Sequence, residues 1–90
     1  MREATITLDN KDGLHARPAA LFVQTARQFT SIVTVENHGR PEKKPIKVSA
    51  FNLLQIGAKS GHSITIRAEG ADEEAALAAL VKLIEDKFGE

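Results

Sequence analysis

Two segments with apolar residues at helical spacing most constrain the fold of this chain. Toward the C-terminal end, beginning after Gly70-Ala71-Asp72, one face of a predicted helix carries Leu77, Leu80, Val81, Ile84 and Phe88. Between residues 16 and 28, a second stripe at the i, i+3, i+4, i+7 spacing consists of Ala19, Phe22, Val23 and Ala26. Because each helix must bury its stripe, the chain needs a layer that both helices can cover.

Four short segments supply that layer. Strands are predicted over residues 4–8, 31–36, 46–48 and 63–68, where apolar residues alternate with polar ones or β-branched residues cluster. The polar loop at 37–45 has the size of a hairpin connection and favours antiparallel pairing. With a short helix after Ser49, the order is βαββαβα. We therefore expect an α+β open-faced sandwich, a four-stranded antiparallel sheet with helices on one face and polar residues on the other.

Composition narrows the class of protein. The chain has 90 residues, and we expect a single domain over residues 1–90. It has no cysteine, which excludes a disulfide framework and thiol catalysis. Twelve basic residues balance twelve acidic ones, so the charge gives no sign of nucleic-acid binding. No apolar signal core or membrane-length run is present, and a cytoplasmic protein without membrane insertion is expected.

The stretch from Gly13 to Ala20 (GLHARPAA) combines a turn, a histidine, an arginine and an early helical proline. Gly13 tolerates the positive φ that a reversal before a helix needs. Pro18 fits only the first turn, where its missing N–H has no partner to lose, so the helix should begin near Ala16. His15 then lies at or beside the N-cap.

This arrangement suits a phosphate. A phosphoryl group on His15 could accept hydrogen bonds from the free N–H groups of the helix start, including that of Ala16, and from the guanidinium of Arg17. The competing interpretation is a surface or capping histidine without chemistry. A metal site is not expected, because His15, His38 and His62 show no short ligand spacing and no recognisable carboxylate pair accompanies them.

Residues beside this stretch predict a docking surface. At about 100° per residue, Leu21 points away from the buried stripe, on the side of Arg17, Ala20 and Gln24. An outward Phe51 with Leu54 on the second helix would extend the patch, although both could equally belong to the core. Ser49 is a good N-cap for that helix, so a regulatory role and simple capping both stay open.

The run Gly13-Leu14-His15-Ala16-Arg17-Pro18-Ala19-Ala20 resembles the active-site motif of the HPr family, the histidine-containing phosphocarriers of the bacterial phosphotransferase system. Residues 49–57 (SAFNLLQIG) resemble the short second helix and regulatory serine of that family. The similarity extends along nearly the whole chain. It implies the open-faced sandwich with strand order 1-4-2-3.

The resemblance also implies a function. His15 would accept a phosphoryl group on its δ1 nitrogen from enzyme I and pass it to sugar-specific EIIA domains. Ser49 would be a target of an HPr kinase/phosphorylase. Such a protein is a monomeric phosphoryl carrier without a cofactor, rather than a free-standing enzyme. Two alternatives remain: a nitrogen-related phosphotransferase carrier, and a regulatory binding module on the same fold. Family modules of the second kind lack the histidine that is present here.

Overall fold

The chain folds into four strands and two main helices in the computed structural model. The structure describes residues 1–9, 13, 16–39, 42, 44–48 and 59–89. Its elements are β1 (Arg2–Thr7), α1 (Ala16–Ala26), β2 (Ile32–Asn37), β3 (Ile46–Lys47), β4 (Ser63–Glu69), α2 (Glu73–Glu85) and the short 3₁₀ turn η2 (Lys87–Gly89). The predicted short helix after Ser49 lies outside the described residues.

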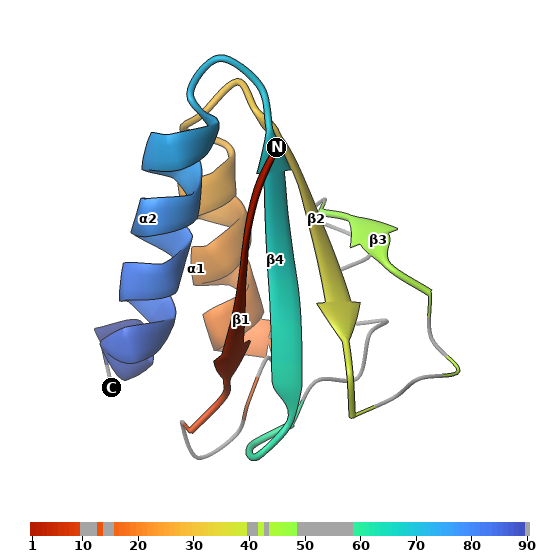
Figure 1. Cartoon of the computed structure of the whole chain (residues 1–90). Helices are drawn as coiled ribbons and strands as arrows, with labels where there is room; N and C mark the ends of the chain where they lie inside the picture. Colours follow the sequence, from red (N-terminus) through yellow and green to blue (C-terminus); the bar gives the residue numbers. More distant parts are fainter. Residues whose placement is uncertain (10–12, 14–15, 40–41, 43, 49–58, 90) are drawn as a thin grey trace.

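The four strands form one antiparallel sheet in the order β1-β4-β2-β3. Both helices lie on one side of this sheet (Figure 1). The open-faced α+β sandwich and the strand order are therefore confirmed. β4 is central, with Ile66 paired to Ala4 of β1 on one side and to Val35 of β2 on the other.

The covered face of the sheet and the two helices share one core. The α1 stripe is buried as predicted, and Phe22 is fully buried. Alternate residues of β2 and β4 meet it from the sheet, namely Val33, Val35, Ile64, Ile66 and Ala68. Full burial of a side chain the size of phenylalanine contributes about 1.5–3 kcal/mol relative to its exposure, so this face holds the two layers together.

The C-terminal stripe is only partly as predicted. Leu80 and Ile84 are buried, whereas Leu77 and Val81, at the edge of the apolar stripe, are half-buried. Phe88 belongs to the core, but it does not extend the helical repeat. α2 ends at Glu85, and Phe88 has a left-handed backbone with a φ of 56°, so a turn rather than a helix returns its ring to the core.

The end of α1 also differs from the expectation. The helix was expected to reach Gln28, but it ends at Ala26. The amides of Gln28 and Phe29 donate to carbonyls three residues earlier, at 3.1 and 3.2 Å, instead of four. This tighter last turn is common where a helix meets a loop, and it leaves Phe29 half-buried against the core.

A carboxylate ties the connection after α1 to the start of α2. Asp72 is the N-cap residue of α2, but its side chain makes no capping hydrogen bond. Its two oxygens accept the backbone N–H groups of Thr30 (2.8 Å) and Ser31 (2.9 Å) and the hydroxyl of Ser31. These bonds, that of the Ser31 hydroxyl first, lower the pKa of Asp72. We call Asp72, Thr30, Ser31 and the adjoining Gly70 the carboxylate clamp.

Gly70, the last member of the carboxylate clamp, lies very close to the backbone of Ser31. Its φ is +154°, and a Cβ added there would lie 2.8 Å from the Cα of Ser31. Only glycine fits this conformation at this distance without strain.

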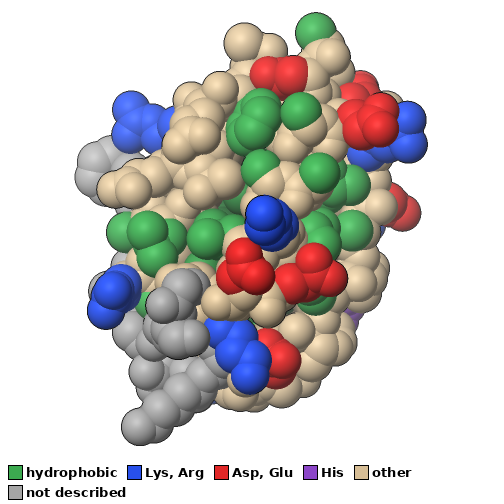
Figure 2. Space-filling view, turned by 90° about the vertical axis from the view of Figure 1, so that its left-hand side faces the viewer, with side chains coloured by type: hydrophobic (Ala, Val, Ile, Leu, Met, Phe, Trp, Pro, Cys, Tyr) green, Lys and Arg blue, Asp and Glu red, His purple; other side chains and the backbone are tan. Residues whose placement is uncertain are grey.

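The outer side of α2 is seen in Figure 2, which faces the left-hand side of Figure 1. Hydrophobic side chains gather across the middle of this view, with basic and acidic side chains among them. Ala71, Ala75 and Ala78 are exposed in this part of the chain. Alanines present little apolar area each, so this side differs from the deep core on the inner side of α2.

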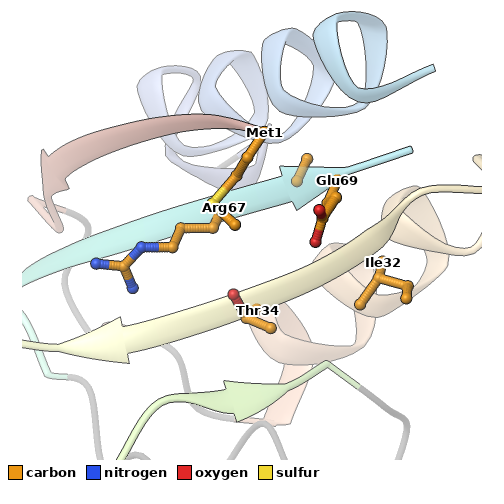
Figure 3. A pocket seen from close by; sticks show the side chains of 6 residues that line it. Met1, Ile32, Thr34, Arg67 and Glu69 are labelled. Carbon is orange, nitrogen blue, oxygen red and sulfur yellow. The ribbon is translucent and has the colours of Figure 1, made fainter. Parts of the chain in front are cut away.

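The uncovered face of the sheet is polar, as expected. Arg67 of β4 pairs with Glu3 of β1 at 2.8 Å and with Glu36 of β2 at 3.1 Å. Hydrogen bonds to these two carboxylates, Glu36 first, raise the pKa of Arg67. A hollow of about 60 Å³ on this face is bordered by Met1 and Ile32, while the Arg67 guanidinium turns away from Glu69 (Figure 3).

Candidate functional site

The start of α1 has the construction that the sequence predicted. The helix begins at Ala16, and Pro18 is its third residue and buried. A proline there removes no helical hydrogen bond and holds φ at a helical value. Gly13 precedes the helix with a φ of 62°, which confirms the expected left-handed glycine before it.

Arg17 is exposed in the first turn of α1, and that turn contains no acidic residue. The unpaired N–H groups of a helix start carry partial positive charge, and here no acidic side chain within the turn neutralises it. The guanidinium adds donors suited to phosphoryl oxygens. His15 immediately precedes Ala16 in the chain and lies outside the described residues. The described part of the site is therefore a cationic helix start that can stabilise an anion.

The structure shows only some of the predicted docking residues to be exposed. Ala20 and Gln24 are exposed on α1, as expected. Leu21 was expected to be an exposed leucine, but it is half-buried and packs against the core. By helical angle Leu21 lies opposite the buried stripe, so its long side chain reaches the core although the angle directs it outward. Phe51 and Leu54 lie outside the described residues, as does Ser49.

Two of the three histidines hold defined structural positions. Nε2 of His38 lies 2.6 Å from the Thr65 hydroxyl on the open face of the sheet. Nδ1 of His62 lies 3.1 Å from the backbone nitrogen of Lys59 and 3.3 Å from Nδ2 of Asn37. Both rings are therefore engaged in contacts within the fold.

The cluster around His62 was not predicted from the sequence. Asn37 is almost completely buried at the end of β2, and its Oδ1 accepts the N–H of Gly39 at 2.9 Å. A Cβ added to Gly39 would lie 2.5 Å from the ring of His62, so the ring packs directly on the glycine backbone. We call His62, Asn37, Gly39 and Lys59 the imidazole clamp. Its members come from the end of β2 and from the turn before β4, which are separated in the chain, and no local spacing pattern connects them.

The imidazole clamp is bonded to the segment that leads to α1. The carbonyl of His62 accepts the N–H of Leu8 at 2.9 Å, and the N–H of Gly61 donates to the carbonyl of Leu8 at 2.7 Å. Leu8 is fully buried and follows β1 directly. The turn at 59–62 thus fixes the point from which the chain departs toward His15.

Neither a metal site nor a membrane span is found among the described residues. In this part of the chain, no three histidine, cysteine or acidic side chains come together as metal ligands. None of the helices in it is long and apolar enough to cross a membrane.

The comparisons with known proteins agree with this geometry. A family model described as the PTS HPr component phosphorylation site matches residues 2–86. The HPr-like protein Crh of Halalkalibacterium halodurans is 44% identical over 94% of this chain and 98% of its own length. The phosphocarrier protein HPr of Xylella fastidiosa is 38% identical, over 100% of this chain and 98% of its own length.

A solved structure of an HPr protein is also similar to this chain. The crystal structure of HPr-C-His from Thermoanaerobacter tengcongensis is 49% identical, with a TM-score of 0.91, and the match covers 100% of this chain and 98% of that one. The matched family model, the similar sequences and the shared strand order lead to one conclusion: this chain belongs to the HPr phosphocarrier family of the phosphotransferase system.

Proposed function

We propose that this protein carries a phosphoryl group on His15, accepting it from phosphorylated enzyme I and passing it to sugar-specific EIIA domains. The observation that carries the proposal is the start of α1. Ala16 begins the helix, Arg17 is exposed in its first turn, and that turn contains no acid. A phosphoryl group on the preceding residue would meet free N–H donors and a guanidinium.

The proposed chemistry needs no cofactor of the carrier. The lone pair of the neutral imidazole of His15, at the δ1 nitrogen by resemblance to the family, forms a bond to phosphorus while the bond to the donor enzyme breaks. The N–H groups and Arg17 stabilise the oxygens of the group in transfer. The next acceptor takes the phosphoryl group by the reverse process, so the carrier is regenerated.

The deciding experiment is phosphorylation by enzyme I and phosphoenolpyruvate at pH 8, with the acid-labile phosphate located by mass. His15→Ala should abolish labelling. His38→Ala and His62→Asn are the matched controls and should label at the rate of the unchanged protein, because both rings serve the fold rather than the site. Full labelling of His15→Ala would exclude this function.

A regulatory binding module is the alternative that a comparison favours, because a protein named HPr-like protein Crh is among the similar ones. The presence of His15 favours the carrier. If the unchanged protein takes no label from enzyme I but still binds a regulatory partner, the module is the correct interpretation. Between the two carrier branches, Ser49 favours sugar transport over the nitrogen-related system.

The docking surface is proposed to include Ala20, Leu21 and Gln24 beside Arg17, with Phe51 and Leu54. Exposure of Ala20 and Gln24 supports it, and the half-buried Leu21 contributes only its outer part. Ala20→Glu should raise the KM for enzyme I with little change in kcat, since it adds charge to a surface position. An unchanged KM would remove this part of α1 from the docking surface.

Ser49 is proposed to be the site of regulatory phosphorylation by an HPr kinase/phosphorylase. A phosphate there would add about −1.5 to −2 charges and would oppose a second phosphate at His15. The serine-phosphorylated protein should accept phosphate from enzyme I more slowly without losing its fold. An unchanged rate would leave Ser49 as a helix cap.

A further inference from the structure

A cleft of about 250 Å³ lies between the end of α1, the start of β2 and the end of β3, and we call it the α1–β3 cleft. Its described apolar lining consists of Ala26, Phe29, Ile32, Val33 and Val48. Two of these, Ala26 and Val33, belong to the buried core, so the cleft has an apolar floor. It borders the end of α1, whereas the predicted phosphate site lies at the start of this helix (Figure 1).

The charged side chains that line the described part of the α1–β3 cleft are both basic. Arg27 follows the last residue of α1, and Lys47 lies on β3, so the two charges come from different elements. Both side chains are exposed. An apolar floor with cations beside it suits a ligand that has an apolar body and a negative charge.

The guanidinium of Arg27 is available for such a ligand. Of the four arginines in the described part of the chain, Arg2 and Arg67 pair with carboxylates. The side chains of Arg17 and Arg27 make no hydrogen bond or ion pair within that part. Arg17 lies at the predicted phosphate site. Among the described arginines, Arg27 alone therefore has neither a carboxylate partner nor a place in that site.

The negatively charged or partially negative groups near the α1–β3 cleft already have donors of their own. The carboxylate of Asp72 accepts hydrogen bonds from Thr30 and Ser31, the polar residues that line the cleft. The carbonyls of the last turn of α1 accept backbone N–H groups from the residues that follow it, at 3.0–3.2 Å. Because donors reach these oxygens from within the fold, they do not need the Arg27 guanidinium.

We propose that the α1–β3 cleft binds a small carboxylate with an apolar body: its ring or short alkyl chain lies against Phe29 and Val33, and its carboxylate pairs with Arg27. A carboxylate fits because the planar guanidinium can donate two parallel hydrogen bonds to its two oxygens. The body must be small, because drug-sized ligands occupy pockets of roughly 300–1,000 Å³. The inference is independent of the carrier function, since neither His15 nor enzyme I takes part in it.

Benzoate is the probe, and benzamide, which has nearly the same shape without the charge, is its matched control. Backbone amide chemical shifts of the unchanged protein are followed during each titration at pH 7 and constant ionic strength, so that screening is equal. Benzoate should give saturable shifts at Phe29, Thr30, Val33 and Val48. Benzamide should bind at the same residues about three- to tenfold more weakly, because it lacks the charge-assisted pair with the guanidinium.

Two arginine substitutions separate the α1–β3 cleft from the start of α1. Arg27→Gln should weaken benzoate about three- to tenfold and leave benzamide unchanged, because only the charged ligand loses a partner. Arg17→Gln removes the same charge at the other end of the helix and should leave both ligands unchanged. Both arginines are exposed, so neither substitution endangers the fold. Val48→Phe places a ring in the cleft and should abolish binding of both ligands.

Three results would overturn the proposal. Absence of saturable shifts around the α1–β3 cleft means that it does not bind a ligand of this class. Equal affinities for benzoate in Arg27→Gln and in the unchanged protein mean that Arg27 does not recognise the carboxylate. Shifts confined to the first turn of α1, and lost in Arg17→Gln, mean that the anion binds at the helix start instead. A failure of labelling by enzyme I would concern the carrier function alone.

Discussion

The two ends of this molecule are fastened by clamps of similar construction and different chemistry. At one end, the carboxylate of Asp72 accepts three hydrogen bonds from Thr30 and Ser31 and joins α2 to the entry of β2. At the other, the imidazole of His62 accepts from Asn37 and Lys59 and joins the exit of β2 to the turn before β4. In each clamp a glycine, Gly70 or Gly39, packs against the joined residue.

The two clamps differ in the accepting group and in their place in the fold. The Asp72 carboxylate has a lowered pKa and stays ionised throughout the physiological range. The carboxylate clamp lies at the end of the sheet away from the start of α1, and the imidazole clamp lies at the end nearer to it (Figure 1).

Gly70→Ala should have the largest effect of the changes that test this comparison. The new methyl group would lie 2.8 Å from the backbone of Ser31, and alanine is strained at a φ of +154°. We expect a loss of about 2–4 kcal/mol in the free energy of unfolding, measured by urea denaturation. A loss below about 1 kcal/mol would show that the carboxylate clamp tolerates displacement of its backbone.

Asp72→Asn should be destabilising in a way that depends on pH. Because the pKa of Asp72 is lowered in the folded state, its contribution is fully present above the unfolded value of about 3.9 and disappears as the pH falls through the folded value. The difference in stability between the two proteins should therefore be large at pH 7 and should shrink below about pH 4. Denaturation midpoints at pH 7 and pH 3 measure this difference, and a constant difference would contradict the assignment.

Gly39→Ala should cost less than Gly70→Ala, although its new methyl group comes closer to a neighbour. The contact, at 2.5 Å, is with the ring of His62, and a side chain can move where a backbone cannot. Gly39 also lies outside the positive-φ glycines. We expect a loss of about 1–2 kcal/mol, because the displaced ring no longer meets its donors. A loss equal to that of Gly70→Ala would mean that the two clamps are equally rigid.

Glu74→Gln is the smallest change and the control for charge alone. Glu74 lies two residues after Asp72, and its carboxylate is 3.4 Å from Arg2 on the exposed surface. Such pairs contribute between zero and about 0.5 kcal/mol and are screened by salt. A stability within about 0.5 kcal/mol of the unchanged protein is expected by the same denaturation assay. A larger loss would mean that surface charge, rather than the geometry of the carboxylate clamp, holds this end.

Local sequence patterns predicted most of the described elements and the start of α1. Pro18 located the first turn of α1 because proline has few other places in a helix, and the stripe containing Phe22 identified the buried face. The clamps could not be predicted in this way. Asp72 has the chemistry of an ordinary helix-start acid, and only the packed fold brings Thr30 and Ser31 to its oxygens. His62 similarly gains its contacts from Asn37, which lies far from it in the chain at the end of β2.

Helical periodicity alone was less reliable for Leu21 and Phe88. Leu21 lies opposite the stripe by angle, yet a long side chain there still reaches the core. Phe88 fits the helical repeat by number, but a left-handed turn brings it to the same place by another path. In both residues, the reach of the side chain or a break in the backbone outweighed the helical angle.

The central place of β4 has a consequence for the order in which the sheet can be made. β1 and β2 precede β4 in the chain, yet they do not touch each other, because β4 lies between them (Figure 1). The bond from Arg67 to Glu3 spans 64 residues. During synthesis, β1 must therefore remain without its partner until most of the chain has emerged, and closing so long a loop is slow. The strand that comes last is the one that completes the sheet on both of its sides.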